Sequence, residues 1–326
     1  MSAQSNGWTH YRLVFRLESP LHIGWRKTGN LMQTRRYVPG KILWGALTAR
    51  LVQMAGQGHN ADAYRQVGEA LQHCFRFGYL WPAQAQKDAG QWHPPRAPHF
   101  PWQEATLEAW DYLYLNGTAR TALEAREHVA SEGMLHQIEY IAPYTREGAP
   151  VYLVGDLWVK GDLEACVSTE IEDPSLSEGV QRWKEALSAL QLGGERGYGW
   201  GKVRLFSCDE VKAPKISWGE GWEWRETAHN GDVEILITTD AKEPVKIPTH
   251  ALAADFSDGE RTERAFSDLS GPVEPWVGWE RTDRGYRVST ARIVYMPDAK
   301  VPPGFQGVLH PWGYLYASEE SAEEAR

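Results

Sequence analysis

The segment LQLGGERGYGWGKVRL, residues 190–205, carries five glycines within nine consecutive positions. Glycine lacks a Cβ atom, so such a run permits positive φ angles and close approach of the backbone to another group. The backbone amides can form an anion-binding nest, and Arg196 and Lys202 add positive charge. We therefore predict that the glycine loop, residues 193–202, binds a bulky anion. The alternative interpretation is a connector whose glycines are purely structural.

The glycine loop matches neither common nucleotide-binding motif. A Walker loop needs GxxxxGK followed by Ser or Thr, whereas Lys202 is followed by Val203. A dinucleotide fingerprint GxGxxG must open a helix, whereas a strand is expected over 202–207. The chain has no HExxH motif, and a proline pair interrupts the spacing of His93 and His99. We predict no cofactor and no metal, and an independent metallohydrolase is disfavoured.

A strongly basic segment lies near the N-terminus. Residues 1–50 contain eight basic residues and one acidic residue, which gives this segment a net charge of +7. Because the whole chain has a net charge of −9, residues 51–326 carry a net charge of −16. Aromatic residues alternate with the basic ones in this segment. Basic side chains beside aromatic rings suit phosphate contact and base stacking, so the distribution of charge favours a nucleic-acid partner in spite of the acidic total. The alternative is a solvated basic loop.

The order of predicted elements defines a fold. Pro39 and Gly40 begin a helix with apolar residues at helical spacing, and a second helix is expected over 61–73. Outside an insertion at about 55–130, the expected order is strand, helix, two strands forming a hairpin, helix and strand. This is the βαββαβ arrangement called ferredoxin-like or RRM-like. The expected elements are strand 11–18, the helix from 39, strands 134–141 and 151–160, a helix over 180–190 and strand 202–207.

The predicted fold class is therefore α+β, with two domains. Residues 1–210 form the ferredoxin-like domain with its helical insertion. Residues 211–326 form a second, smaller α+β domain that ends in an acidic tail.

Composition excludes several classes of protein. The chain has no apolar run long enough for a membrane span and no basic-then-apolar N-terminus typical of a secretory signal. Three widely spaced cysteines without a CxxC pair argue against a zinc ribbon or a disulfide scaffold and favour a reducing compartment. We expect a cytoplasmic protein without a membrane partner.

Three motifs together resemble the RAMP superfamily of CRISPR-associated RNA-binding proteins. They are SPLHIG (19–24), YVPGKILWGALTARL (37–51) and the glycine-loop segment, in the family's order. The resemblance covers roughly residues 10–55 and 134–206 and implies a ferredoxin-like domain that binds guide RNA. The residues it assigns to RNA binding are His22, Gly24, Trp25, Arg26, Lys27, Arg35, Arg36, Lys41, Gly193, Gly194, Arg196, Gly197, Tyr198, Gly199, Gly201 and Lys202.

Within this family three roles are open. A backbone subunit that tiles the guide RNA cuts target RNA with an aspartate before the PG helix, but residues 24–39 contain no Asp or Glu. A processing endoribonuclease uses a histidine, for which His22 and His59 are candidates. A subunit that caps the 5′ handle needs no catalytic residue and carries its glycine loop mid-chain, as here. The resemblance thus implies a non-catalytic capping subunit of a type III-like effector complex. Its partners would be guide RNA and other subunits, including a large polymerase-like subunit.

Overall fold

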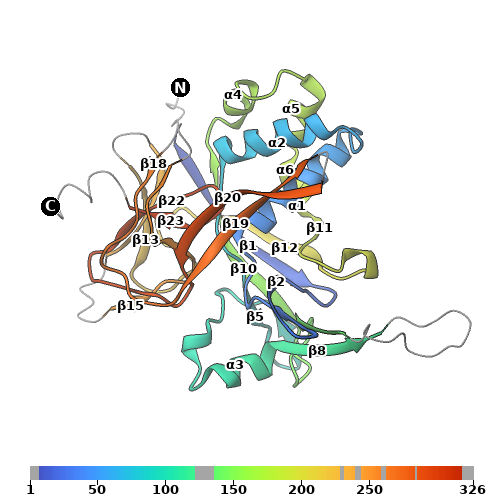
Figure 1. Ribbon diagram of the computed structural model, residues 1–326, viewed down its shortest axis with the longest axis vertical. Helices are drawn as coiled ribbons and strands as arrows, with labels where there is room; N and C mark the ends of the chain where they lie inside the picture. Colours follow the sequence, from blue (N-terminus) through green and yellow to red (C-terminus); the bar gives the residue numbers. More distant parts are fainter. Residues whose placement is uncertain are drawn as a thin grey trace, which may run out of the picture.

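The computed structural model describes residues 7–121, 136–227, 231–238, 244–257, 262–282 and 285–317. Within these ranges the chain forms six α-helices and two large β-sheets with several smaller ones, which confirms the α+β class (Figure 1). None of the helices in the described part is long and apolar enough to cross a membrane.

The first large sheet, here the central sheet, has the strand order β11-β12-β1-β10-β4, and β5 also pairs with β10. All of its pairings are antiparallel. The long strands β1 and β10 lie at its centre, where Leu13 is opposite Gly155. The strands are β1 (Trp8–Leu17), β4 (Phe75–Phe77), β5 (Trp81–Gln84), β10 (Val151–Lys160), β11 (Ala189–Gln191) and β12 (Lys202–Glu210).

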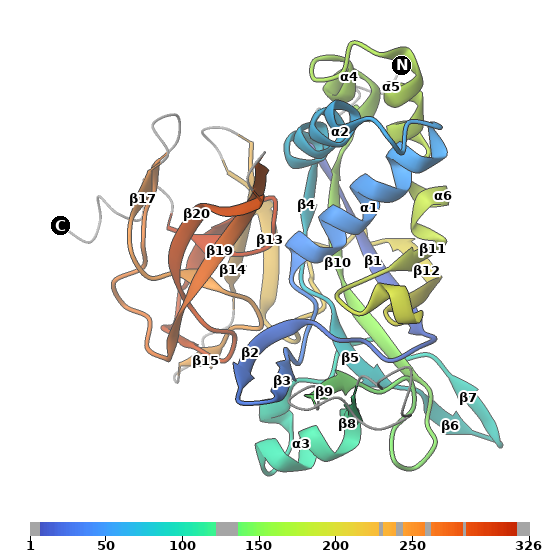
Figure 2. The same cartoon turned by 45° about the vertical axis from the view of Figure 1, so that its right-hand side comes forward.

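Helices cover one face of the central sheet, and α1 crosses β1 and β10 in Figure 2. The predicted apolar positions Leu43, Leu47 and Leu51 of α1 are fully buried and pack in one core with Leu13 and Phe15 of β1. The first two helices of the sequence analysis are therefore confirmed. The helices on this face are α1 (Gly40–Met54), α2 (Ala61–Cys74), α4 (Leu163–Ser168), α5 (Pro174–Gln181) and α6 (Trp183–Leu187).

The expected hairpin between strands 134–141 and 151–160 is wrong. The first of these strands, β9 (His136–Ile141), belongs to a separate sheet ordered β2-β3-β9-β8, in which it pairs in parallel with β3. Its place beside β10 is taken by β4 and β5, which are too short for sequence periodicity to reveal. The partner strands are β2 (Gly24–Thr28), β3 (Leu31–Thr34) and β8 (Leu115–Arg120).

The segment expected as a helical insertion is mixed instead. Its described part contributes α2 and strands β4 and β5 to the central layer, and β8 to the small sheet. Residues 122–130 lie outside the described residues. The other elements of this segment are β6 (Gln86–Asp88), β7 (Gln91–His93), the 3-10 turn η1 (Pro101–Gln103) and α3 (Leu107–Tyr114).

The second large sheet is built from the C-terminal third and has the order β13-β14-β22-β23-β16-β20-β19. Between 211 and 317 the described residues contain no helix, so the expected α+β second domain is all-β there. Frequent Pro and Gly divide this region into apolar runs too short for helices. Its strands are β13 (Trp222–Glu226), β14 (Val233–Ile237), β16 (Ala251–Leu252), β19 (Val273–Thr282), β20 (Gly285–Tyr295), β22 (Gln306–Leu309) and β23 (Leu315–Tyr316).

Two further strand pairs lie in the same region: β15 (Val245–Lys246) with β21 (Lys300–Val301), and β17 (Phe256–Ser257) with β18 (Thr262–Glu263). Trp8 and Trp158 of the central sheet belong to the same apolar core as Ile235 and Leu309 of the second sheet. The two large sheets therefore share a core rather than being joined only by the chain. The predicted acidic tail lies outside the described residues.

Cys74, at the end of α2, forms a disulfide with Cys166 of α4. The wide spacing of the three cysteines, without a CxxC pair, had argued against a disulfide scaffold and for a reducing compartment; this disulfide, between residues 92 positions apart, does not favour that compartment. Packing of α4 against α2 brings them together, a contact that the spacing of the cysteines does not reveal.

Candidate nucleic-acid interface

Backbone hydrogen bonds hold the glycine loop on the turn that ends β1. The amide of Gly194 donates to the carbonyl of His22 at 2.9 Å, and the amide of Gly201 donates to the carbonyl of Pro20 at 2.7 Å. The SPLHIG turn and the glycine loop, which lie about 170 positions apart in the sequence, are thus joined directly.

Two glycines of the loop have a packing explanation. Gly193 has φ +72°, and a Cβ atom there would collide with the carbonyl oxygen of His22. Gly201 has φ +76°, and its Cβ would collide with the carbonyl oxygen of Leu192. The structural interpretation of the loop therefore holds at these two positions, because any side chain there would prevent the loop from packing on the turn.

The outer part of the loop is exposed and unconstrained by packing. Arg196, Gly197 and Tyr198 form the 3-10 turn η2 (Arg196–Tyr198), and Tyr198 is 71% exposed. Gly199 has φ +79°, and a Cβ at Gly197 would face open space. Arg196 is exposed, so its charge is available for contact with a phosphate. The amides of Tyr198 and Gly199 instead donate within the loop, to the carbonyls of Glu195 and Arg196, so these two amides do not form the predicted anion-binding nest.

A residue that the sequence analysis missed extends this surface. Arg120, at the end of β8, lies over the ring of Tyr198 at 4.4 Å and over that of Trp200 at 4.8 Å. Trp200 is buried and also meets the ring of Tyr140 at 5.0 Å. The glycine loop thus presents a row of arginine and aromatic groups, of the kind that contacts single-stranded nucleic acid. The sequence contains no signal for this role of Arg120, because it depends on β8 lying beside the glycine loop in the folded protein.

His22 is a structural residue of the turn. It is 7% exposed, and its Nδ1 atom lies 2.7 Å from the carbonyl oxygen of Glu139. Gly24, two residues later, begins the exposed strand β2. The second histidine candidate, His59, lies in the exposed α1–α2 turn, where the neighbouring Gln57 bonds Asp173. The two histidines therefore do not form one site.

The predicted basic segment divides into two groups. Arg26 and Lys27 are exposed on β2, where Arg26 lies 4.3 Å from the ring of Trp25. Arg35 and Arg36, in contrast, are paired with carboxylates: Arg35 with Glu274 at 2.5 Å and Arg36 with both oxygens of Asp111 at 2.6 Å. Two of the basic residues assigned to RNA binding are thus neutralised within the fold.

Lys41 and the start of α1 also face the second sheet rather than the glycine loop. Burial lowers the pKa of Lys41 to about 8, and its ammonium lies 4.6 Å from the ring of Trp312. A Cβ at Gly40 would collide with the carbonyl oxygen of Phe77 and approach that of Trp312 at 2.7 Å. The PG motif therefore serves close packing, and the start of α1 is covered by these two segments.

A buried polar network lies behind Arg35. The carboxylate of Glu274 accepts hydrogen bonds from Arg35 and from His250 Nε2, the latter at 2.7 Å, and His250 Nδ1 lies 2.5 Å from the hydroxyl of Tyr79. Burial lowers the pKa of His250 to about 4, so the ring is neutral at pH 7. Burial by itself raises the pKa of Glu274, but the bonds from His250 and Arg35 outweigh it and lower this pKa to about 2. The network joins the first part of the chain to the second sheet.

Comparison with known proteins gives only distant similarity. No protein-family model and no curated protein matches the chain. Among solved structures, chains of the Type III-B Cmr-beta bound to cognate target RNA are similar at 11% identity and TM-score 0.35, covering 60% of this chain and 96% of that one. A chain of the Type III-B Cmr-beta bound to cognate target RNA and AMPPnP has 13% sequence identity and a TM-score of 0.42, and the match covers 89% of this chain and 85% of that one. A chain of the apo state of Type III-B Cmr-beta has 12% sequence identity and a TM-score of 0.34, and the match covers 62% of this chain and 97% of that one. Likeness at TM-scores below 0.5 does not establish a shared fold.

Proposed function

We propose that this protein is a non-catalytic guide-RNA-binding subunit of a type III-like CRISPR effector complex. In this role it caps the 5′ handle of the guide RNA and docks a large polymerase-like subunit. The observation that carries the proposal is the direct seating of the glycine loop on the SPLHIG turn. Two of the three motifs that resemble the RAMP superfamily thereby form one surface, with an exposed arginine and tyrosine at its edge.

The arrangement of the central sheet supports the ferredoxin-like assignment. Along the sequence these strands are β1, β4, β10 and β12, and α1 lies between β1 and β4. Their order in the sheet, β12-β1-β10-β4, with helices on one face, supports the split βαβ arrangement that we propose. We propose residues 1–210 as this domain and 211–326 as the second, all-β in its described part. We further propose a cytoplasmic location without a membrane partner.

The surroundings of the candidate catalytic groups favour a binding role. His22 is buried and engaged by a backbone carbonyl, and no carboxylate lies between 24 and 39 to act in target cleavage. A general acid or base must reach the proton that it transfers, which a buried ring held in a turn does not. Neither the processing endoribonuclease nor a cutting backbone subunit is favoured by a specific contact.

The experiment that tests the proposal is the substitution Arg196→Ala, with Arg65→Ala as the matched control. Arg196 is expected to contribute a charge-assisted phosphate contact, so its loss should weaken binding of repeat-containing RNA by about 1–3 kcal/mol. Arg65 is also exposed but lies on α2 in ion pairs with Asp62 and Glu69, and its substitution should leave affinity unchanged. Fluorescence anisotropy measures both affinities. Equal affinity of the two variants contradicts the proposal.

Incubation of the same RNA with the wild-type protein separates binding from processing. We expect no cleavage. Specific metal-independent cleavage that is lost in His22→Ala would replace the capping role with that of a processing endoribonuclease.

A further inference from the structure

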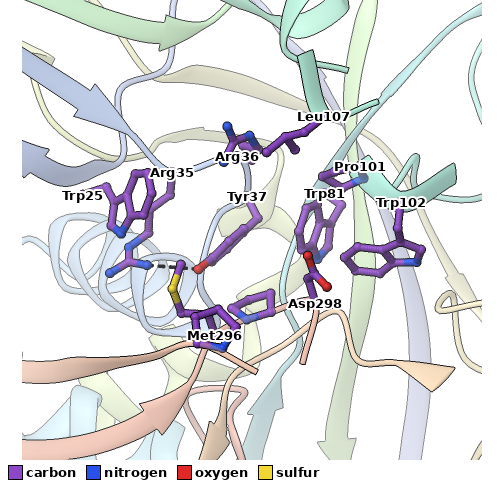
Figure 3. Close-up of a pocket in the computed structure, with 12 residues that line it drawn as sticks. Trp25, Arg35, Arg36, Tyr37, Trp81, Pro101, Trp102, Leu107, Met296 and Asp298 are labelled. Carbon is purple, nitrogen blue, oxygen red and sulfur yellow. Dashed lines mark hydrogen bonds between the residues drawn. The ribbon is translucent and has the colours of Figure 1, made fainter. Parts of the chain in front are cut away.

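A cavity lies between segments that are far apart in the sequence (Figure 3). It is lined by residues of β2, the segment 35–37 before α1, β5, the segment 101–107, and positions 272 and 296–298. Its volume is about 190 Å³. Cavities for drug-sized molecules measure roughly 300–1,000 Å³, so this one suits a smaller ligand, of about one ring system.

Aromatic rings make up much of the cavity wall. Trp25, Tyr37, Trp81 and Trp102 all line it. The rings of Tyr37 and Trp81 are 4.8 Å apart, and those of Trp81 and Trp102 are 5.8 Å apart and nearly perpendicular. Tyr37 and Trp81 are almost completely buried, so the rings that a planar aromatic ligand can reach are those of the partly buried Trp25 and Trp102.

Hydrogen bonds hold these rings in place. Trp25 donates from Nε1 to Glu274 at 3.0 Å, and Trp81 donates from Nε1 to the carbonyl of Pro248 at 2.8 Å. The hydroxyl of Tyr37 accepts from Arg35 at 3.0 Å, the bond drawn in Figure 3. A wall fixed before the ligand arrives lowers the entropy lost on binding.

The cavity also has polar groups with unused capacity. Among the described residues, Nε and Nη2 of Arg35 and Nη1 of Arg36 make no hydrogen bond, although both arginines are held by carboxylates through other atoms. The carboxylate of Asp298 lies at the rim, half-exposed, 3.1 Å from Lys246. The cavity therefore presents hydrogen-bond donors and an acceptor beside aromatic faces.

We infer that this cavity holds one unstacked nucleobase. The aromatic wall would take the ring, Asp298 would accept from base N–H groups, and the arginines would donate to the phosphate or to base oxygens. A nucleotide of a bound RNA and a free nucleotide share this chemistry. We assign it to a nucleotide of the guide RNA, an assignment that rests on the proposed function.

The test combines two ligands with one pair of variants. Trp102→Ala removes a half-buried wall residue, and Trp92→Ala removes a tryptophan that is 41% exposed on β7, outside the cavity. The full-length protein is titrated by calorimetry with each of the four nucleoside monophosphates and with inorganic phosphate. It is then titrated with single-stranded guide RNA that carries 2-aminopurine at successive positions.

We expect Trp102→Ala, but not Trp92→Ala, to weaken nucleoside monophosphate and RNA binding by roughly 5- to 150-fold, the effect of losing one base–aromatic stack. One 2-aminopurine position should change in fluorescence with the wild type and not with Trp102→Ala. Asp298→Asn provides a second variant that preserves the left-handed backbone at this position (φ +89°), because Asn tolerates that conformation. It should alter the preference among the four monophosphates.

The outcomes separate the two proposals. Tight RNA binding with no monophosphate binding and no effect of Trp102→Ala overturns the nucleobase site and leaves the proposed function standing. Monophosphate binding that needs Trp102, without RNA binding by the wild type, supports a nucleotide site and overturns the proposed function. Inorganic phosphate binding as tightly as the monophosphates overturns the recognition of a base.

Discussion

Replacing Gly193 with Ala should destabilise the protein much more than replacing Gly197 with Ala, although both glycines lie in the same loop. At Gly193 the backbone is left-handed, which raises the energy of a non-glycine residue by roughly 1–2 kcal/mol. The new Cβ would also collide with the carbonyl oxygen of His22, which accepts the hydrogen bond from Gly194. Loss of that bond adds about 0.5–1.5 kcal/mol.

The expected decrease in the free energy of unfolding is therefore about 1.5–3.5 kcal/mol for Gly193→Ala. A Cβ at Gly197 meets nothing within 4 Å, so Gly197→Ala should change stability by no more than about 0.5 kcal/mol. Urea unfolding followed by tryptophan fluorescence measures both values. If the two variants unfold at the same urea concentration, the loop is not seated on the SPLHIG turn, and the observation that carries the proposed function is lost.

Three further results are expected. The folded-state pKa of His250, about 4, lies below its ordinary value of about 6.5, so the stability contributed by the neutral ring is fully present above pH 6.5 and should fall by about 3 kcal/mol as pH falls to about 4. Urea unfolding at several pH values should show this decrease. His250→Phe should remove the part between pH 6.5 and about pH 5, above the range in which Glu274 becomes protonated in the unfolded chain. Cys166→Ser should lower the stability of the oxidised protein by about 4 kcal/mol, because the cross-link to Cys74 closes a loop of about 90 residues, and should change nothing in the presence of reductant. The logarithm of RNA affinity should fall with the logarithm of salt concentration with a slope of about −0.7 for each phosphate contacted, and an affinity independent of salt would contradict binding through the backbone of the RNA.

The sequence analysis succeeded where local pattern carries the information. The helix from Gly40 and the strand at 202–207 follow from apolar spacing and from glycine and proline positions, and both are present. It failed where a segment's partner matters more than its own pattern. The strand over 136–141 exists, but it pairs with β3 and β8 in a different sheet, because pairing depends on what lies alongside in space.

The candidate site shows the same division. Clustered glycines, the SPLHIG turn and exposed arginines can be recognised from residue types alone, because glycine and charge have local consequences. The sequence does not show which basic residues stay free. Glu274 and Asp111 lie 239 and 75 positions away from the arginines that they neutralise.

By itself, the sequence of this protein determined the helix start at Pro39, the alternating strands and the glycine loop, since each depends on the backbone preferences of a few neighbouring residues. Only the tertiary structure decided that Arg120 lies against Tyr198 and that Cys74 meets Cys166. The physical reason is that these contacts join segments that are brought together by the packing of whole helices and sheets. No short stretch of sequence determines that packing.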